Sequence, residues 1–546
     1  MSCPAPLPSS PAFVKGPQPP GPDRLPLSAW GVLAVALLFR ILWLGDKPPH
    51  FDEGVNGWFI DQMRETGFYH YDPGNYHGPF HFYVLYLAQT FFGRDVAVLR
   101  FPTALIGTAT VWLILQYRRF LSWRVCLWAA AAFAVSPAEV FYSRYAIHEA
   151  WLVFGLVLAV WGLAEIWNYG TRRGLHAAAA GVTLLVLTKE TYVIHLIALV
   201  LAGGTLRWLE RLRPSCPPLP LHPAPRLWTR QDGFQTAAVC LLAILFFYSG
   251  GFLDPSSLPG LYQTFGKWFN TGVLEETGHE KPFFYWLELL GRYEWPAALG
   301  VLLSGMALLP GMSGLLRYLA IYGCGTLVAY SLVAYKTPWC VISLLWPFCF
   351  LFGYGVEWAS GRWKTVPTVA AALVVIASAG WSARLSFIRP TDYRNEKYVY
   401  VQTLNDLSLL TEPLDRLTKL APSARHLSIC ILLSSYHPLP WVLGDYTAVG
   451  YYDGRESAAP LEEAAVIVAE DAQISAVEGR LSRPFFRSTF HLRDGMDPGT
   501  LYLDAERFAP VFPGRVPEFT PLPRPPAVPA PEPRPPKPRE EPSPEP

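Results

Sequence analysis

The chain has 546 residues, of which 51% are hydrophobic and only 16% are charged. Soluble globular proteins carry about 25% charged residues, so this composition excludes an ordinary soluble multidomain protein. The 44 Lys and Arg residues balance the 43 Asp and Glu residues, which argues against nucleic acid as a partner. The cysteines show no metal-binding spacing and most lie in apolar runs, so no disulfide framework is expected.

Apolar runs of about 20 residues, the length that spans a bilayer, recur from residue 27 to residue 385. They predict about eleven transmembrane helices. The predicted spans are 27–45, 97–117, 125–142, 150–167, 175–188, 191–208, 235–251, 296–311, 318–335, 339–356 and 366–385. Three further segments, 53–66, 79–93 and 283–295, are expected to form helices at the outer membrane interface. The segment 79–93 could be one more span, but it is short, and counting it would place Arg118 and Arg119 on the outer side. The predicted fold is an all-α polytopic membrane protein with about 11 to 13 transmembrane helices.

Arginine residues gather in the loops that these spans place on the side of the N-terminus. Examples are Arg118, Arg119, Arg172 and Arg211. Positively charged loops mark the cytoplasmic side of a membrane protein. The sequence therefore predicts a multi-pass protein of the plasma (inner) membrane, with a cytoplasmic N-terminus and an extracytoplasmic C-terminus.

The composition predicts four parts along the chain. They are a disordered Pro-rich cytoplasmic tail (1–26), a transmembrane domain (27–385), a small extracytoplasmic α/β domain (386–509) and a second disordered Pro-rich tail (510–546). The α/β domain is expected because charged residues return after Ser386. There, short apolar runs at 427–433, 464–469 and 500–503 alternate with helical patterns such as 395–411.

Two adjacent carboxylates, Asp52 and Glu53, follow the first predicted span. A carboxylate beside the reacting atoms can accept the proton of an acceptor hydroxyl. An N-cap is an equally good interpretation, in which Asp52 opens the 53–66 helix and acidic residues favour its first turn. The two interpretations are compatible, and the sequence leaves both open.

Other polar residues crowd the loops on the predicted outer side. The stretch 69–81 holds Tyr76, His77 and His81, a composition that suits a sugar-stacking surface, a metal-binding surface or an ordinary interface. Arg144 and Glu149 lie in one short loop, where a helix ion pair is the alternative to a functional role. The remaining candidates are Lys189, His279, Lys336 and Trp339.

This collection of charges favours a lipid phosphate as a ligand. Cations suit a phosphate group, and carboxylates suit a hydroxyl nucleophile. The sequence contains no Asp-x-Asp and no Gly-rich phosphate loop, so a nucleotide-sugar site is not expected. A phosphate bound from the outer side would therefore belong to a lipid.

Several segments resemble the GT-C membrane glycosyltransferases of the dolichyl-phosphate-mannose protein mannosyltransferase superfamily. They are PHFDEGVNGWFI, YHYDPGNYHGPF, YSRYAIHEA, LTKET and YKTPW, and within the superfamily they are most similar to the "flippase activity-associated" membrane proteins. The resemblance covers roughly residues 28–390. It implies a lipid-phosphate sugar donor and an active site between the first outer loop and the membrane.

The resemblance also implies a role for each candidate residue. Asp52 is then the general base, and Glu53 helps to hold the acceptor or the donor. Lys336, Lys189 and Arg144 bind the donor phosphate, and the substrate-binding residues are Glu149, Tyr76, His81 and Trp339. His279 lies in a motif with Pro282 and Phe283.

Related aminoarabinose transferases carry an acidic-Lys-Pro motif in the first loop, with a metal shared by a histidine of the large loop. Here the motif reads His77-Gly78-Pro79, so the acidic ligand is replaced and the lysine is lost. No cofactor is firmly implied, although His77 and His279 would suit a divalent metal such as zinc.

The sequence thus predicts an inverting glycosyltransferase that moves a sugar from a polyprenyl-phosphate donor to a glycan, lipid or protein acceptor on the outer side. Membrane lipid is the other expected partner. Two alternatives remain, a flippase of lipid-linked oligosaccharides and a non-catalytic partner of one. Charges gathered at one membrane face favour the enzyme, because transporter sites lie near the bilayer midplane.

Overall fold

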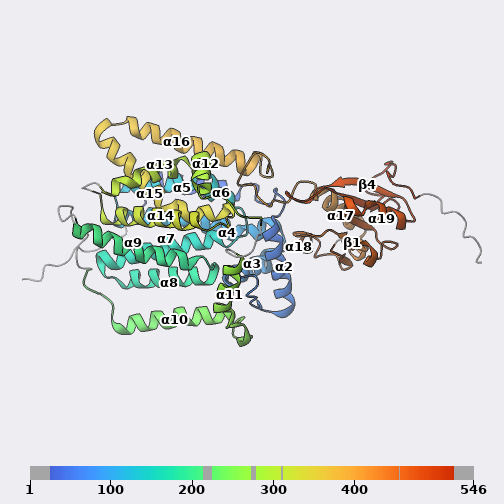
Figure 1. Cartoon of the computed structure of the whole chain (residues 1–546), viewed down its shortest axis with the longest axis horizontal. Helices are drawn as coiled ribbons and strands as arrows, with labels where there is room; N and C mark the ends of the chain where they lie inside the picture. Colours follow the sequence, from blue (N-terminus) through green and yellow to red (C-terminus); the bar gives the residue numbers. More distant parts are fainter. Residues whose placement is uncertain (1–24, 213–223, 272–277, 309–311, 454, 522–546) are drawn as a thin grey trace, which may run out of the picture. The chain divides into compact units, whose positions relative to one another are not determined.

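The computed structural model describes residues 25–212, 224–271, 278–308, 312–453 and 455–521 (Figure 1). The chain forms two compact units. The first, called the helical unit here, runs to Leu407 and also takes in two later segments, Tyr436–Asp445 and His491–Met496. The second contains the rest of the C-terminal region. The predicted boundary at residue 386 therefore differs from the division between the compact units.

Long apolar helices make up most of the helical unit. In chain order these and the shorter helices are α1 (Leu27–Ile41), α2 (Phe51–Thr66), α3 (Phe80–Phe92), α4 (Val96–Gln116), α5 (Trp123–Ala134), α6 (Pro137–Ser143), α7 (Glu149–Tyr169), α8 (Arg172–Thr188), α9 (Tyr192–Leu212), α10 (Arg230–Tyr248), α11 (Gly260–Phe269), α12 (Tyr285–Tyr293), α13 (Trp295–Leu303), α14 (Gly314–Leu332), α15 (Ile342–Trp363), α16 (Val366–Ala383) and α18 (Leu439–Val442). Each of the eleven predicted apolar runs falls on one of these helices, or on the α5–α6 pair.

Seven helices of the described chain are long and apolar enough to cross a membrane. The α5–α6 pair, bent by 56° at its break, would make an eighth. The chain is therefore a multi-pass membrane protein, as predicted. α2, α3 and α12 lie on the three segments expected at the membrane interface, and their position in the membrane stays a prediction.

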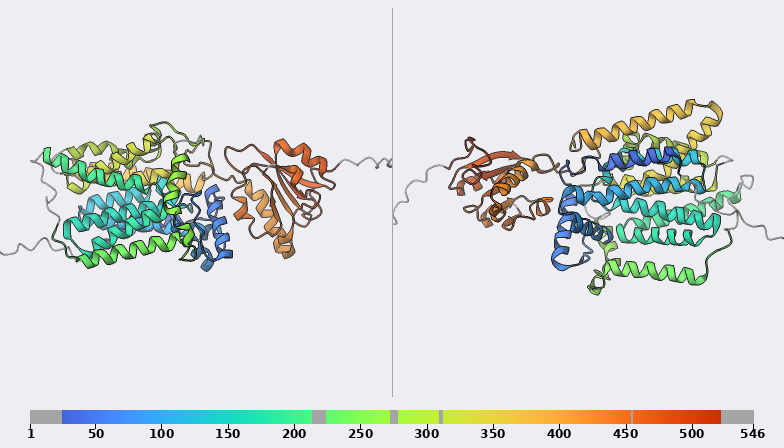
Figure 2. Two further views of the ribbon diagram at one scale, coloured as in Figure 1. Left: turned by 60° about the horizontal axis from the view of Figure 1, so that its bottom comes forward. Right: turned by 180° about the vertical axis from the view of Figure 1, so that it is seen from behind.

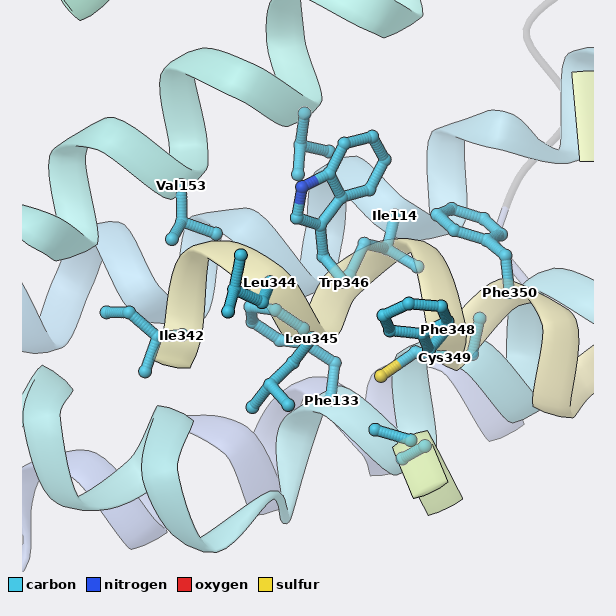
Figure 3. Close-up of a cluster of buried hydrophobic side chains, with 14 of the residues drawn as sticks. Ile114, Phe133, Val153, Ile342, Leu344, Leu345, Trp346, Phe348, Cys349 and Phe350 are labelled. Carbon is cyan, nitrogen blue, oxygen red and sulfur yellow. The ribbon is translucent and has the colours of Figure 1, made fainter. Parts of the chain in front are cut away.

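The bundle is organised around α15, which is apolar on all sides and buried over most of its length. Figure 3 shows this core, with Ile342, Leu344, Leu345, Trp346, Phe348, Cys349 and Phe350 on α15. Ile114 of α4, Phe133 of α5 and Val153 of α7 pack against them. The long helices run side by side, and α2 and α11 cross one end of the bundle (Figure 2). This end carries the loop that leads from α1 into α2.

The second unit contains a five-stranded sheet with the order β2–β1–β3–β5–β4. Its strands are β1 (Ile429–Leu432), β2 (Val449–Tyr451), β3 (Val466–Glu470), β4 (Phe485–Phe490) and β5 (Gly499–Asp504), and its helices are α17 (Leu407–Leu420) and α19 (Ile474–Arg480). β1 pairs in parallel with β2 and β3, whereas β5 is antiparallel to β3 and β4. The predicted small α/β domain is confirmed, with strands at the three predicted apolar runs.

Two local predictions for this region were wrong. The helical pattern at 395–411 forms a helix only from Leu407, because Glu396 and Tyr398 instead contact the helical bundle, where Tyr398 stacks on Tyr293 with ring centroids 4.5 Å apart. The predicted tail 510–546 begins too early, since Phe519 exchanges backbone hydrogen bonds of 2.9 and 3.1 Å with Phe485. The tail prediction for 522–546 and most of that for 1–26 lie outside the described residues.

Candidate functional site

Asp52 lies in the first turn of α2, but it does not cap the helix. His50 is the N-cap, since its Nδ1 accepts a hydrogen bond of 3.1 Å from the backbone N–H of Asp52. The His50 Nε2 lies 2.9 Å from the carbonyl oxygen of Tyr400, so a neutral ring protonated at Nε2 satisfies both contacts. Burial lowers the pKa of His50 and so favours this neutral form. The N-cap interpretation of Asp52 is therefore wrong, and its carboxylate is left without a capping role.

Glu53 is fully buried and completes a capping box with the backbone N–H of His50, at 2.8 Å. Both of its oxygens accept from Arg100 of α4, at 2.8 and 2.7 Å, and one also accepts from the N–H of Ala146 at 2.8 Å. Although burial raises the pKa of this carboxyl, Arg100 outweighs it and brings the pKa to about 2. A carboxylate held by so many donors is a poor base, so the geometry favours a structural role for Glu53.

Two loops of the bundle meet as a short antiparallel pair, which brings His279 and Lys336 together. The N–H of Lys336 donates to the carbonyl of His279, and the N–H of Lys281 donates to that of Ala334, both at 3.0 Å. The ammonium of Lys336 donates to the carbonyls of Lys281, at 3.1 Å, and Val333. Within the described chain it has no carboxylate partner, so its positive charge is not neutralised by the protein.

The hydroxyl of Tyr400 lies 2.6 Å from Nδ1 of His279, and its ring lies under the ammonium of Lys281, 5.3 Å from the centroid. The ring of Trp339 is nearly perpendicular to that of His50, with centroids 5.5 Å apart, and tilted against that of Tyr400, with centroids 6.2 Å apart. Contacts through Tyr400 and Trp339 thus join His279 and Lys281 to His50 at the start of α2.

The carboxylate of Asp52 is part-exposed, with 38% of its side chain accessible. Its negative charge acts on side chains from several other parts of the helical unit. These are Tyr76, His279, Tyr335, His437 and Arg493. Burial lowers the pKa of His279, Lys281 lowers it further, and Asp52 opposes both. Asp52, His279 and Lys336, which the sequence places far apart, are therefore brought to one region.

Lys189 belongs to a neighbouring group of charges. Its Nζ is 2.5 Å from Oε1 of Glu149, and Glu190 forms an ion pair of 3.0 Å with Nδ1 of His77. Burial lowers the pKa of Lys189, but Glu149 and Glu190 outweigh it and raise the pKa well above its usual value. His77 and Lys189 form a backbone bridge, which needs Gly78, since a Cβ there would lie 2.3 Å from the Leu187 backbone. Lys189 is thus a cation that two carboxylates already neutralise.

Arg144 does not pair with Glu149. Its guanidinium donates to backbone carbonyls at the end of α1, including those of Leu42 at 2.7 Å and Trp43 at 2.9 Å. Four such carbonyls are left unpaired at a helix C-terminus, where a cation is favourable. The alternative of an Arg144–Glu149 pair is wrong, and the geometry favours a structural role for Arg144.

The ring of His148 contacts those of both His77 and His81, tilted against each. The ring centroids of His77 and His148 are 4.7 Å apart, and those of His81 and His148 are 4.4 Å apart. Nδ1 of His81 accepts from the indole N–H of Trp151 at 3.1 Å. His81 is fully buried, whereas Tyr76 and His77 are part-exposed.

These buried imidazoles predict acid sensitivity. Burial lowers the pKa of His81 to about 4, against about 6.5 in an unfolded chain. The native state then binds fewer protons, so stability falls as the pH drops from 6.5 towards 4, by about 2 kcal/mol at pH 5. The thermal midpoint in detergent should fall by a few degrees between pH 7.5 and pH 5. His81→Gln, which keeps an acceptor for Trp151, should reduce this fall, and an unchanged fall would contradict the assignment.

A metal site is not supported by the geometry. No group of three or more His, Cys, Asp or Glu side chains in the described ranges is placed to hold a metal ion. His77 is paired with Glu190, and His279 is paired with Tyr400. The metal predicted between His77 and His279 stays a prediction, and no step below depends on it.

Comparison with known proteins places this arrangement in a fold. Residues 76–214 match a sequence-family model described as dolichyl-phosphate-mannose-protein mannosyltransferase. The crystal structure of ArnT from Cupriavidus metallidurans bound to undecaprenyl phosphate aligns with a TM-score of 0.60 and 14% identity, over 88% of this chain and 99% of ArnT. The chain has a GT-C fold.

The apo form of the same ArnT aligns with a TM-score of 0.57, also at 14% identity, over 88% of this chain and 98% of ArnT. The mycobacterial arabinofuranosyltransferase AftD gives a TM-score of only 0.46, at 13% identity over 87% of this chain and 40% of AftD, which is too low to support an argument. A comparison with curated protein sequences finds no match. The finer resemblance to the "flippase activity-associated" proteins stays a prediction.

The sequence analysis assigned no role to several residues of this region. Arg100, Glu190, Lys281, Tyr400 and Arg493 all contact or act on predicted site residues. The sequence held a signal for Arg100. Burying an arginine within an apolar run costs free energy, so such a residue is expected to pair with a buried partner. No sequence signal links Tyr400 or Arg493 to Asp52, since both lie more than 300 residues further along the chain.

Proposed function

We propose that the protein is a membrane glycosyltransferase that moves a sugar from a polyprenyl-phosphate carrier to an acceptor hydroxyl on the outer side. The observation that carries this proposal is the part-exposed carboxylate of Asp52, which acts on His279, while the backbone of His279 pairs with that of Lys336, whose ammonium has no carboxylate partner in the described chain. The GT-C fold and the match to a dolichyl-phosphate-mannose-protein mannosyltransferase model support the reaction class.

Asp52 and Lys336 divide the chemistry between them. Asp52 takes the proton of the acceptor hydroxyl as its oxygen attacks the anomeric carbon. The bond from that carbon to the phosphate oxygen breaks, and the polyprenyl phosphate leaves with the electron pair. Direct displacement inverts the anomeric centre. The negative charge that grows on the leaving phosphate is stabilised by the ammonium of Lys336.

Among the three predicted phosphate ligands, the hydrogen bonds favour Lys336. Lys189 already pairs with a carboxylate, and the guanidinium of Arg144 donates to four backbone carbonyls. The ammonium of Lys336 donates to two carbonyls and keeps a third N–H for a phosphate oxygen. Lys336 is therefore the primary phosphate ligand in this proposal, and Lys281, which lies beside it, is the second. Glu149 orients Lys189, and the aromatic rings of Tyr76 and Trp339 are suited to contact the sugar.

The test uses the full chain, purified and placed in lipid nanodiscs or studied in isolated membranes. Polyprenyl-phosphate monosaccharides with radiolabelled sugars are supplied as a panel, and label transferred to a product is measured together with released polyprenyl phosphate. Transfer with release supports the enzyme. If the donor changes sides in proteoliposomes with its sugar–phosphate bond intact, the protein is a flippase. If neither transfer nor movement of the donor is observed, the protein is a non-catalytic partner.

Lys336→Gln should reduce both donor binding and transfer. A hydrogen bond to a charged group contributes about 1.5–3 kcal/mol, so undecaprenyl phosphate should bind about 10- to 100-fold more weakly. Lys419→Gln is the matched control, since Lys419 is exposed on α17 in the second unit. Undiminished binding of undecaprenyl phosphate to Lys336→Gln would remove Lys336 from the phosphate site.

A further inference from the structure

Two short segments from the C-terminal part of the chain belong to the helical unit. Tyr436–Asp445, which contains α18, lies between β1 and β2 in the sequence, and His491–Met496 lies between β4 and β5. Both segments reach α2, whose first turn carries Asp52. α18 packs against α2 (Figure 1), and Arg493 lies over the ring of Phe51. The proposed function above gives them no role.

α18 packs on α2 at two glycines spaced three residues apart. A Cβ on Gly54 would lie 2.3 Å from Cβ of Pro438, and a Cβ on Gly57 would lie 2.3 Å from Cγ of Trp441. Trp441 is almost fully buried there. Residues three apart lie on the same face of a helix, so the glycines form one flat face that admits α18. A side chain at either position would displace it.

Arg94 binds both sides of the α2–α18 contact. Its guanidinium donates to both carboxylate oxygens of Asp61 on α2, at 3.2 and 2.9 Å, and also to the carbonyl of Trp441. It also lies over the Trp441 ring, 5.1 Å from the centroid. One arginine thus joins the helix to the C-terminal segment.

The second segment reaches the first turn of α2. The guanidinium of Arg493 lies over the ring of Phe51, 4.5 Å from the centroid, and donates to the carbonyl of His437 at 3.3 Å. The ring of His437 meets that of Phe51 at 5.3 Å. Arg493 is buried and its positive charge interacts with the carboxylate of Asp52.

The Arg493 segment is itself held by the chain that follows α16. Thr403 forms an antiparallel bridge with Arg493, and the N–H of Leu404 donates to the carbonyl of Leu492 at 2.9 Å. Gln402, next in this stretch, donates to the carbonyl of Pro48 just before α2 and accepts from the hydroxyl of Tyr145. Arg493 is therefore fixed relative to the start of α2 from two sides.

We infer that Arg493 and the α2–α18 contact are positioning elements of the catalytic centre, which hold the first turn of α2 and its Asp52 carboxylate where the acceptor hydroxyl is deprotonated. This inference rests on the proposed function for its catalytic meaning. Positioning matters because a displacement of about 1 Å can cost on the order of 100-fold in rate. The C-terminal region then takes part in sugar transfer although its sheet lies in a separate unit.

The first test replaces Arg493. In membranes supplied with a labelled polyprenyl-phosphate sugar, Arg493→Gln should lower the maximal transfer rate about tenfold or more and leave the KM for the donor nearly unchanged. Arg493→Lys, which keeps the cation, should restore much of the rate. Arg455→Gln, an exposed arginine of the second unit, is the control and should behave as wild type. An unchanged rate in Arg493→Gln would overturn the inference.

The second test adds a side chain to the glycine face of α2, and its measurement does not depend on activity. Gly57→Ala forces the Trp441 ring to move, whereas Gly291→Ala on α12 adds a Cβ into open space. Hydrogen–deuterium exchange in the first turn of α2 should accelerate in Gly57→Ala and stay unchanged in Gly291→Ala. Unchanged exchange in both variants would overturn the inference. If the wild type transfers no sugar while exchange responds as expected, the proposed function fails and the positioning contact stands.

Discussion

Replacing Asp52 by asparagine should lower sugar transfer about 10²- to 10⁴-fold, with normal expression and membrane insertion. Asparagine has almost the shape of aspartate but cannot accept a proton at neutral pH. The helix should not suffer, because its N-cap is His50 and its capping box uses Glu53. The loss should therefore appear in the maximal rate, while binding of undecaprenyl phosphate is kept.

The matched control is Asp95→Asn. Asp95 is an N-cap in fact, since its carboxylate accepts from the N–H groups of Ala97 at 2.7 Å and Val98 at 3.4 Å at the start of α4. Asparagine ranks with aspartate at such positions, so transfer and stability should both stay near wild type. Near-normal transfer by Asp52→Asn would end its assignment as the base. Glu149 would then be the next carboxylate to test.

The helical part of the fold was predictable because each membrane span is a continuous apolar run, which can be recognised without knowledge of the rest of the chain. A run such as 339–356 is apolar on every side, which predicts a helix without knowledge of its neighbours, and α15 is found there. The start of α17 was not predictable in this way. The stretch from Glu396 to Gln402 has helical periodicity, but its side chains bind the bundle through distant partners such as Tyr293 and Tyr145.

Which candidate residues share one side of the chain could be predicted from the sequence, but the contacts of each residue could not. The topology gathered Asp52, Lys189, His279 and Lys336 on one side from charge and loop order alone. It could not tell which charges neutralise one another, because Lys189 and Glu149 are 40 residues apart and meet only in the fold. Arg144 illustrates the same limit, since its partners are backbone carbonyls, which carry no sequence signal.

Glu53 is the residue for which the resemblance and the geometry disagree most. The resemblance implies that it holds a substrate. In the fold both of its oxygens are occupied by Arg100 and by two backbone N–H groups, and neither it nor Arg100 is accessible to solvent. A pair of this kind joins α2 to α4 and fixes the loop between α1 and α2.

Glu53→Gln should therefore lower the stability of the fold, while the rate of sugar transfer per folded molecule changes little. Glutamine leaves the guanidinium of Arg100 buried without a counter-charge, and breaking a buried pair in this way costs about 3–5 kcal/mol. We expect low yields in membranes and a clearly lower thermal midpoint, with residual transfer in proportion to the folded protein. Glu65→Gln, on the exposed face of the same helix, is the control and should stay near wild type. If Glu53→Gln instead keeps its thermal midpoint and loses turnover, the carboxylate of Glu53 acts on the substrate, as the resemblance implies.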